Sequence, residues 1–296
     1  MGMLVNFSAE LADWIEHNLA RGCGVDALVE SMVAQRFEPH IARGLAQAFW
    51  HAREEGRAPP QEAISIDALD DQPQPYVYET PRLPSGPVIR TFDRDVPVLM
   101  RLARPMLAVL DGVLSADECT QLIALARPRL RPSTVVDPVS GQDTVTDNRD
   151  SDGMFFQLRE TPFIARLDQR ISEIMKCPVE HGEGLQVLRY GPQAKNTPHF
   201  DFLVPSHAAN RASLDRSGQR ISTMVIYLND VASGGETVFP EIGLAVTPKQ
   251  GHAVYFEYAN SLQQVDVASV HAGAPVHAGE KWAITKWMRE RRFVPA

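Results

Sequence analysis

The run Ile221-Ser-Thr-Met-Val-Ile-Tyr-Leu228 combines β-branched and aromatic residues without glycine or proline, which predicts a β-strand. Four shorter runs of the same kind are separated from it and from one another by segments that contain Gly and Pro. They are residues 185–190, 237–239, 253–258 and 282–288. The second half of the chain is therefore expected to be rich in short strands.

Two helices are expected ahead of these strands. Ser115-Ala-Asp-Glu118 is a capping box, and the helix that it starts ends before Pro128. Thr161-Pro162 opens a second helix, because apolar residues at helical spacing follow it. Two helices followed by a strand-rich half predict an α+β fold with a jelly-roll core flanked by helices.

The N-terminal part has a different character. Residues 1–57 carry three short stretches of amphipathic helical spacing, which predict a small all-α bundle. Residues 58–86 are rich in proline, which fits neither a helix interior nor an inner strand, so they are expected to form an extended linker. The remaining residues, 87–296, are expected to be the jelly-roll domain.

Composition excludes several classes of partner. The 296 residues hold 29 Lys and Arg against 37 Asp and Glu, a net charge of −8, so no general basic field favours nucleic acid or an anionic membrane. The three cysteines are scattered, and neither a signal peptide nor a membrane span is recognised. These features predict a reduced, cytoplasmic protein without nucleic-acid or membrane partners.

The sequence His199-Phe-Asp201 suggests a metal site. Side chains two apart in an extended chain project to the same face, so an imidazole and a carboxylate can bind one ion together. His271 offers a third ligand at the end of another strand-like stretch. Two His and one carboxylate form the facial triad of non-haem Fe(II) oxygenases, although zinc accepts the same ligands. Lys281 favours the oxygenase, because an ammonium inside a jelly roll needs an anion such as a dicarboxylate beside it.

Several further motifs carry a family resemblance. They are Ser269-Val-His-Ala-Gly-Ala-Pro-Val-His-Ala-Gly-Glu-Lys-Trp282, Thr285-Lys-Trp287, Gly234-Gly-Glu-Thr-Val-Phe-Pro240 and Tyr227-Leu-Asn-Asp-Val231. With them the chain from about Pro105 to Arg292 resembles the prolyl 4-hydroxylase family of 2-oxoglutarate- and Fe(II)-dependent dioxygenases. The resemblance implies a double-stranded β-helix, a kind of jelly roll.

The resemblance also implies the cofactors and their ligands. It gives His199, Asp201 and His271 as ligands of Fe(II), with Lys281 binding the distal carboxylate of 2-oxoglutarate. Dioxygen is the second cosubstrate, succinate and CO2 are released, and ascorbate is a candidate additional cofactor. The presence of Asp201 argues against an iron halogenase, because halogenases of this class lack that carboxylate.

Further residues are assigned by the same resemblance. Tyr190, Thr223 and Tyr227 are expected near the cosubstrate, with ordinary core packing as the alternative for both tyrosines. Four residues are expected to bind the substrate, namely Arg149, Ser151, Arg220 and Trp287. A solvated loop arginine or a structural tryptophan is the alternative interpretation there.

Three positions depart from the family pattern. Asn196 stands where the family often has Tyr, Ala274 where Cys is usual, and Arg289 where related enzymes often have His. None of these changes touches the expected iron ligands. The substrate groove is affected, so the sequence leaves the prime substrate open.

The sequence thus predicts a dioxygenase that hydroxylates an unactivated carbon, with a prolyl residue of a peptide or protein as the preferred target. Three alternatives stay open. They are a hydroxylase of a free amino acid or small molecule, a cupin-like zinc or manganese enzyme, and a non-catalytic adaptor that works through the N-terminal bundle. The bundle is expected to recruit a protein or to mediate dimerisation.

Overall fold

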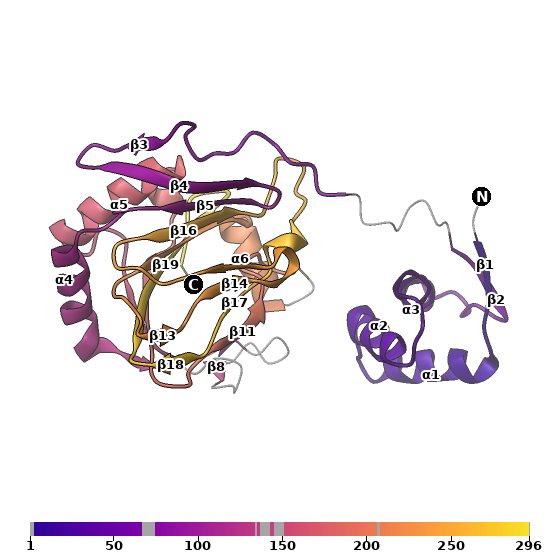
Figure 1. Cartoon of the computed structure of the whole chain (residues 1–296). Helices are drawn as coiled ribbons and strands as arrows, with labels where there is room; N and C mark the ends of the chain where they lie inside the picture. The colour runs from indigo at the N-terminus through magenta and orange to yellow at the C-terminus, as the bar shows by residue number, and fades with distance from the viewer. Residues whose placement is uncertain are drawn as a thin grey trace. The chain divides into compact units, whose positions relative to one another are not determined.

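The computed structural model describes residues 3–66, 75–133, 135–136, 143–144, 151–205 and 208–295. Contacts divide the chain into two compact units, Met1–Pro75 and Tyr76–Ala296, both drawn in Figure 1. Among the described residues, no helix combines the length and the apolar character that crossing a bilayer requires.

The N-terminal unit contains three helices, α1 (Ala9–Ala20), α2 (Val25–Ala34) and α3 (Pro39–Glu54). The side chain of Ser8 caps α1 by accepting a hydrogen bond from Leu11 N, at 3.2 Å. The apolar faces of all three helices contribute to one core, in which Ile15, Leu45 and Phe49 are almost fully buried. The three helices predicted from the spacing of apolar residues are therefore confirmed.

The prediction that this unit is all-α is wrong, because β1 (Met3–Asn6) pairs with β2 (Ala63–Ile66) in an antiparallel two-stranded sheet. The prediction of a linker over residues 58–86 is wrong at the same place. Pro59 and Pro60 precede β2, and β2 itself contains no proline, so its backbone N–H groups can pair with β1. The pairing joins residues about sixty positions apart, which local patterns do not reveal.

The second unit is built on a nine-stranded sheet with the order β3-β4-β5-β16-β12-β19-β10-β9-β6. All neighbouring strands in it are antiparallel. The bounds are β3 (Val88–Arg90), β4 (Asp95–Ala103), β5 (Met106–Leu110), β6 (Arg131–Pro132), β9 (Ser151–Phe156), β10 (Leu185–Tyr190), β12 (Arg220–Tyr227), β16 (Ala253–Glu257) and β19 (Lys281–Arg289).

A smaller sheet has the order β11-β17-β14-β15. Its strands are β11 (Asn196–His199), β14 (Thr237–Phe239), β15 (Leu244–Val246) and β17 (His271–Gly273). Two short pairs complete the strands, β7 (Val135–Val136) with β8 (Asp143–Thr144) and β13 (Ser233–Gly234) with β18 (Val276–Ala278).

Two cores lie on opposite faces of the large sheet. On one face, helices α4 (Ala116–Ala126) and α5 (Pro162–Met175) pack against it, with Leu122 and Ile171 fully buried (Figure 1). On the other face, Tyr227 and Phe256 of the large sheet meet Phe239 of the small sheet. This second core joins the two sheets into a jelly roll, so the α+β jelly-roll prediction is confirmed for this unit.

The remaining helices are short or lie beside the jelly roll. They are α6 (Ala208–Ser217) and the single-turn 3-10 helices η1 (Arg127–Arg129), η2 (Val179–His181), η3 (Pro240–Ile242) and η4 (Val267–Ser269).

Candidate metal centre and cosubstrate pocket

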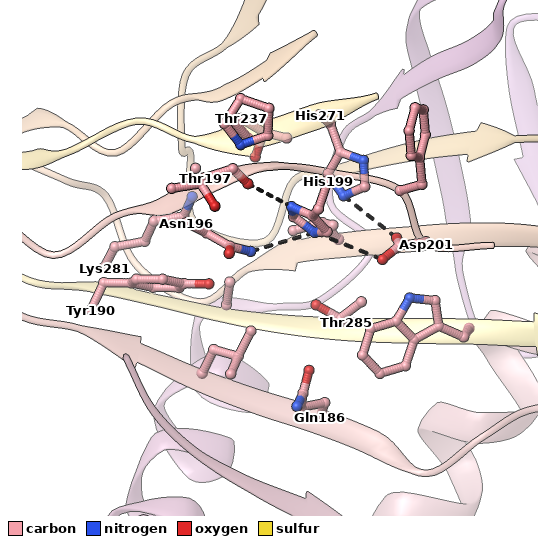
Figure 2. Close-up of a pocket in the computed structure, with 18 of the residues that line it drawn as sticks. Gln186, Tyr190, Asn196, Thr197, His199, Asp201, Thr237, His271, Lys281 and Thr285 are labelled. Atoms are coloured by element: carbon pink, nitrogen blue, oxygen red, sulfur yellow. Dashed lines mark hydrogen bonds and ion pairs between the residues drawn. The ribbon is translucent and has the colours of Figure 1, made fainter. Parts of the chain in front are cut away.

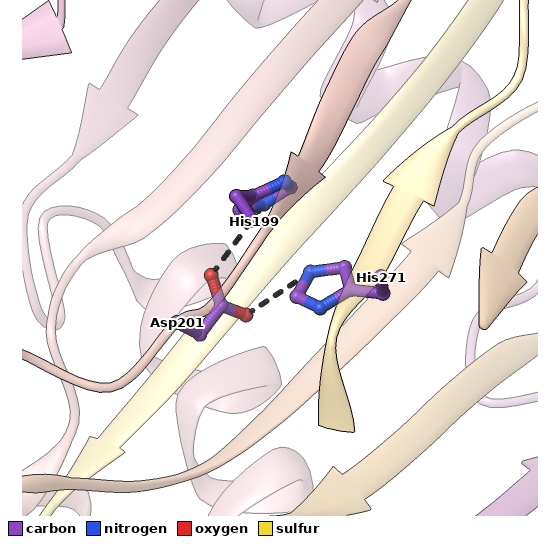
Figure 3. A group of neighbouring side chains, drawn as sticks. All are labelled: His199, Asp201 and His271. Carbon is purple, nitrogen blue, oxygen red and sulfur yellow. Dashed lines mark ion pairs between the residues drawn. The ribbon is translucent and has the colours of Figure 1, made fainter. Parts of the chain in front are cut away.

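His199, Asp201 and His271 converge at one point (Figure 3). The Nε2 atom of His271 lies 3.5 Å from Asp201 Oδ2, and that of His199 lies 3.9 Å from Asp201 Oδ1. One ligand atom from each residue can be chosen so that all three lie within 4.8 Å of one another. This spacing suits three ligands that share one ion.

The small sheet creates this convergence. His199 ends β11 and His271 begins β17, and the two are directly opposite in the antiparallel register. Their rings therefore meet, with centroids 4.3 Å apart. Asp201 follows two residues after His199, so its carboxylate returns to the same face of the extended chain.

Backbone carbonyls orient both imidazoles. Nδ1 of His199 lies 2.8 Å from Thr197 O, and Nδ1 of His271 lies 3.1 Å from Ser269 O. When each Nδ1–H donates to its carbonyl, each Nε2 keeps a lone pair that can bind a metal; the Nε2 of His199 also lies 3.4 Å from the side-chain nitrogen of Asn196. In both cases the carbonyl belongs to the residue two positions before the histidine, and the contact favours the tautomer with the proton on Nδ1.

The electrostatics of the triad also suit a cation. Burial lowers the pKa of His271 to about 4, so this imidazole is neutral at physiological pH. Burial raises the pKa of Asp201, but both imidazoles and Arg220 outweigh it, and the carboxyl pKa falls below its usual range. Two imidazole nitrogens and one carboxylate are a donor set that fits Fe(II).

The triad borders a cavity of about 660 Å³ between the two sheets (Figure 2). Strands β10 and β19 of the large sheet supply Gln186, Tyr190, Lys281 and Thr285 to its wall, and β14 of the small sheet supplies Thr237. The volume is typical of a small-molecule site.

Lys281 carries a buried charge in this cavity. It is only 5% exposed, and its Nζ lies 5.6 Å from the Tyr190 ring centroid and 5.5 Å from that of Tyr227. Burial lowers its pKa to about 8, with Glu236 opposing the shift. Within the described part of the chain, no carboxylate lies at ion-pair distance from it. The ammonium is therefore placed to receive an anion from outside the protein.

Residues 185–289 match the family model described as the 2OG-Fe(II) oxygenase superfamily. Prolyl 4-hydroxylase 1 of Arabidopsis thaliana is 42% identical over 202 residues, which cover 63% of this chain and 70% of that protein. The chain belongs to the prolyl 4-hydroxylase family of 2-oxoglutarate- and Fe(II)-dependent dioxygenases.

The chain is also similar to a second curated protein and to a solved structure. The prolyl 4-hydroxylase subunit alpha-1 of Gallus gallus is 36% identical over 211 residues, which cover 71% of this chain and 39% of that protein. The crystal structure of the viral collagen prolyl hydroxylase of Paramecium Bursaria Chlorella virus-1 superposes with a TM-score of 0.49 and 26% identity, covering 62% of this chain and 95% of that one. Membership of the family shown above makes the enzyme a dioxygenase that uses Fe(II) and 2-oxoglutarate.

The residues predicted near the cosubstrate divide into two groups. Tyr190 lines the cavity, next to Lys281 in the register of β10 and β19. Thr223 and Tyr227 do not line it among the described residues, because their hydroxyls are bonded elsewhere. Thr223 donates to Asp201 Oδ2 at 2.7 Å, and Tyr227 donates to Thr237 Oγ1 at 2.8 Å. Thr223 therefore contacts the metal ligand Asp201, and its predicted contact with the cosubstrate stays a prediction.

Thr237 lines the cavity, as Thr197 and Thr285 do, and the sequence reasoning did not select it. A signal was present, because Thr237 lies in the Gly-Gly-Glu-Thr motif that carried part of the family resemblance. Gln186 and Thr285 were also missed. They are opposite each other in the register of β10 and β19, and both side chains line the cavity.

The predicted substrate-binding residues lie in three different situations. Arg220 and Trp287 line the cavity, with the guanidinium 4.0 Å from the indole centroid. Ser151 is buried at the start of β9 and bonds to Ser133, so the cavity wall does not include it. Arg149 lies outside the described residues.

Glu183 holds Arg220 in place. Its carboxylate accepts two hydrogen bonds from Arg220, at 2.7 and 2.8 Å, and one from Arg289 at 3.0 Å. Burial raises the pKa of Glu183, but the two guanidiniums reverse the effect and lower it overall. A single acidic residue next to two glycines gave no sequence signal for this role.

Proposed function

We propose that the enzyme hydroxylates a prolyl residue of a peptide or protein and releases succinate and CO2. The observation that carries the proposal is one cavity that combines the His199–Asp201–His271 triad with the buried ammonium of Lys281. The related proteins named prolyl 4-hydroxylase support the prolyl target. They do not favour the alternatives of a free amino acid, a zinc isomerase or an adaptor.

The protein residues bind and orient the reactants. A ferrous ion held by the triad supplies the chemistry that transfers one oxygen atom of dioxygen to an unactivated carbon. Lys281 pairs with the distal carboxylate of 2-oxoglutarate in a charge-assisted contact. The hydroxyls of Tyr190 and Thr237 face the same part of the cavity and are suitable hydrogen-bond partners for that carboxylate (Figure 2).

The rim of the cavity suits a peptide. Phe155 and Phe200 are exposed and border it, and Trp287 lies in its wall with Arg220 against the ring. Aromatic faces offer apolar contact to a prolyl ring with little loss of side-chain entropy. Arg220 is already paired with Glu183, so we expect it to orient Trp287 and the Asp201 backbone.

The test uses the full chain with Fe(II), 2-oxoglutarate and a set of proline-containing peptides, with free proline as the competing substrate. Mass spectrometry is expected to show the gain of one oxygen atom on a prolyl residue, with one succinate released for each product. His199→Ala is expected to abolish both signals. Oxygen gain on free proline alone would refute the peptidyl target.

Three predictions about the setting of the enzyme join this proposal. We propose that the N-terminal unit recruits a protein substrate or a second copy of the chain, that ascorbate sustains turnover, and that the enzyme works in the cytoplasm. Removal of residues 1–75 is expected to weaken turnover of a protein substrate more than that of a short peptide. Equal losses for both would contradict recruitment.

A further inference from the structure

The carboxylate of Asp201 is tied to the opposite sheet. Thr223, on β12 of the large sheet, donates a hydrogen bond of 2.7 Å to Asp201 Oδ2 beside the small sheet. Both side chains are buried, with Thr223 at 0% and Asp201 at 5% exposure. A hydrogen bond to an ionised group is strong when both partners are as shielded from solvent as these two.

The Thr223 hydroxyl contacts a second hydroxyl, that of Tyr258. The hydroxyl oxygen of Tyr258, directly after β16, lies 2.9 Å from Thr223 Oγ1. The threonine hydroxyl has a single hydrogen, and the ionised carboxylate can only accept. Since Thr223 gives its hydrogen to Asp201, Tyr258 must donate to Thr223. The two hydroxyls form a series directed at Oδ2.

We propose that Thr223 and Tyr258 are positioning residues that act in series on the metal ligand Asp201. They fix the rotation of the carboxylate, so that Oδ1 faces His199 and Oδ2 faces His271. Arg220 Nη1 donates a hydrogen bond of 3.3 Å to the backbone oxygen of Asp201 and restrains its main chain. Carboxylate ligands held by such partners bind metal more tightly, because their orientation is set before the ion arrives.

The series is separable from packing. Valine has nearly the volume and shape of threonine, so Thr223→Val keeps the buried contacts and removes the hydroxyl. Thr223→Ser keeps the hydroxyl and removes a methyl group. Tyr258→Phe removes only the second donor.

The experiment measures Co(II) binding to the full-length apoprotein by its visible ligand-field absorption, without any substrate. Thr223→Val is expected to weaken Co(II) affinity about tenfold and to alter the absorption bands, since loss of an outer-shell partner typically costs about 10–100-fold. Thr223→Ser is expected to restore both, and Tyr258→Phe is expected to weaken affinity about threefold. In the Thr223→Val background, Tyr258→Phe is expected to add nothing, because it acts through Thr223.

Tyr255→Phe is the matched control. Tyr255 is a fully buried tyrosine of β16, and its hydroxyl donates to Glu257, away from the metal centre. This variant is expected to lose stability without a change in Co(II) affinity. The proposal is overturned if Thr223→Val binds Co(II) as the wild type does, or if the two hydroxyl losses add in the double variant. The readout needs no prolyl substrate, so it fails or succeeds independently of the proposed function.

Discussion

Replacing Lys281 with Met is expected to stabilise the unliganded enzyme and to weaken its binding of 2-oxoglutarate. Methionine has a similar length and no charge, so it can fill the space of the lysine stem. Burial lowers the pKa of Lys281 from 10.5 to about 8, which means that the folded protein disfavours the ammonium. At about 1.4 kcal/mol for each pKa unit, the buried charge reduces the free energy of unfolding by roughly 3 kcal/mol at neutral pH.

The pH dependence gives the prediction its sign. Because the pKa of Lys281 is lower in the folded than in the unfolded chain, the penalty is complete below pH 8. It decreases as the pH rises from 8 toward 10.5, where the unfolded lysine also loses its proton. We therefore expect Lys281→Met to exceed the wild type in stability by up to about 3 kcal/mol at pH 7, with a smaller difference at pH 9.5.

The assay is urea unfolding in the presence of a chelator and without 2-oxoglutarate. Both proteins carry Trp14→Phe and Trp50→Phe, so that fluorescence reports only Trp282 and Trp287 of the catalytic unit. A second measurement titrates 2-oxoglutarate into each protein by calorimetry, with an expected affinity loss of about 10–100-fold in the variant. The reasoning is refuted if the variant is less stable than the wild type at pH 7, or if the difference does not change with pH.

Three further predictions concern the buried framework of the site. Lys286 and Asp168 form a fully buried ion pair at 2.9 Å, so Lys286→Met is expected to lower the free energy of unfolding in urea by about 3–5 kcal/mol. Adding Asp168→Leu should recover most of this loss, and a Lys286→Met variant as stable as the wild type would contradict the prediction. A Cβ on Gly184 would lie 2.3 Å from Phe156 O, so Gly184→Ala should lower the free energy of thermal unfolding by more than about 2 kcal/mol. A Cβ on Gly191 would meet nothing within 4 Å, so Gly191→Ala should lower it by less than about 0.5 kcal/mol, and equal losses would exclude the clash. Glu183→Gln weakens the hold on Arg220 and is expected to lower succinate production about tenfold, and unchanged turnover would show that this ion pair is dispensable.

Local patterns predicted the strands of the large sheet that border the site, but not β11 and β17, which carry His199 and His271. The run 221–228 became β12 (Arg220–Tyr227), and the run 185–190 became β10 with the same bounds. Alternating or continuous runs of β-forming residues are read from neighbouring positions alone, which explains this success. The capping box at Ser115 likewise placed the start of α4 correctly, because a cap is a contact between residues three apart.

Features that depend on distant residues were harder to predict. The pairing of β1 with β2 needs two segments about sixty residues apart, and neither has a distinctive pattern. The family resemblance placed Thr223 near the cosubstrate, but it could not show that the Thr223 hydroxyl would donate a hydrogen bond to Asp201. Metal ligands and Lys281 were found because their chemical types are rare in an apolar interior, whereas Thr237 offers only an ordinary hydroxyl.

The central position of β17 in the small sheet has one further consequence. Gly273 is paired with Asn196 of β11 on one side and with Thr237 of β14 on the other, while His271 begins the same strand. The strand that carries His271 is thus hydrogen-bonded on one side to the strand of His199 and on the other side to the strand of Thr237. Metal binding should therefore slow amide hydrogen exchange along β14 as well as along β11. The metal-free and the metal-bound enzyme would then differ in the rigidity of the small sheet.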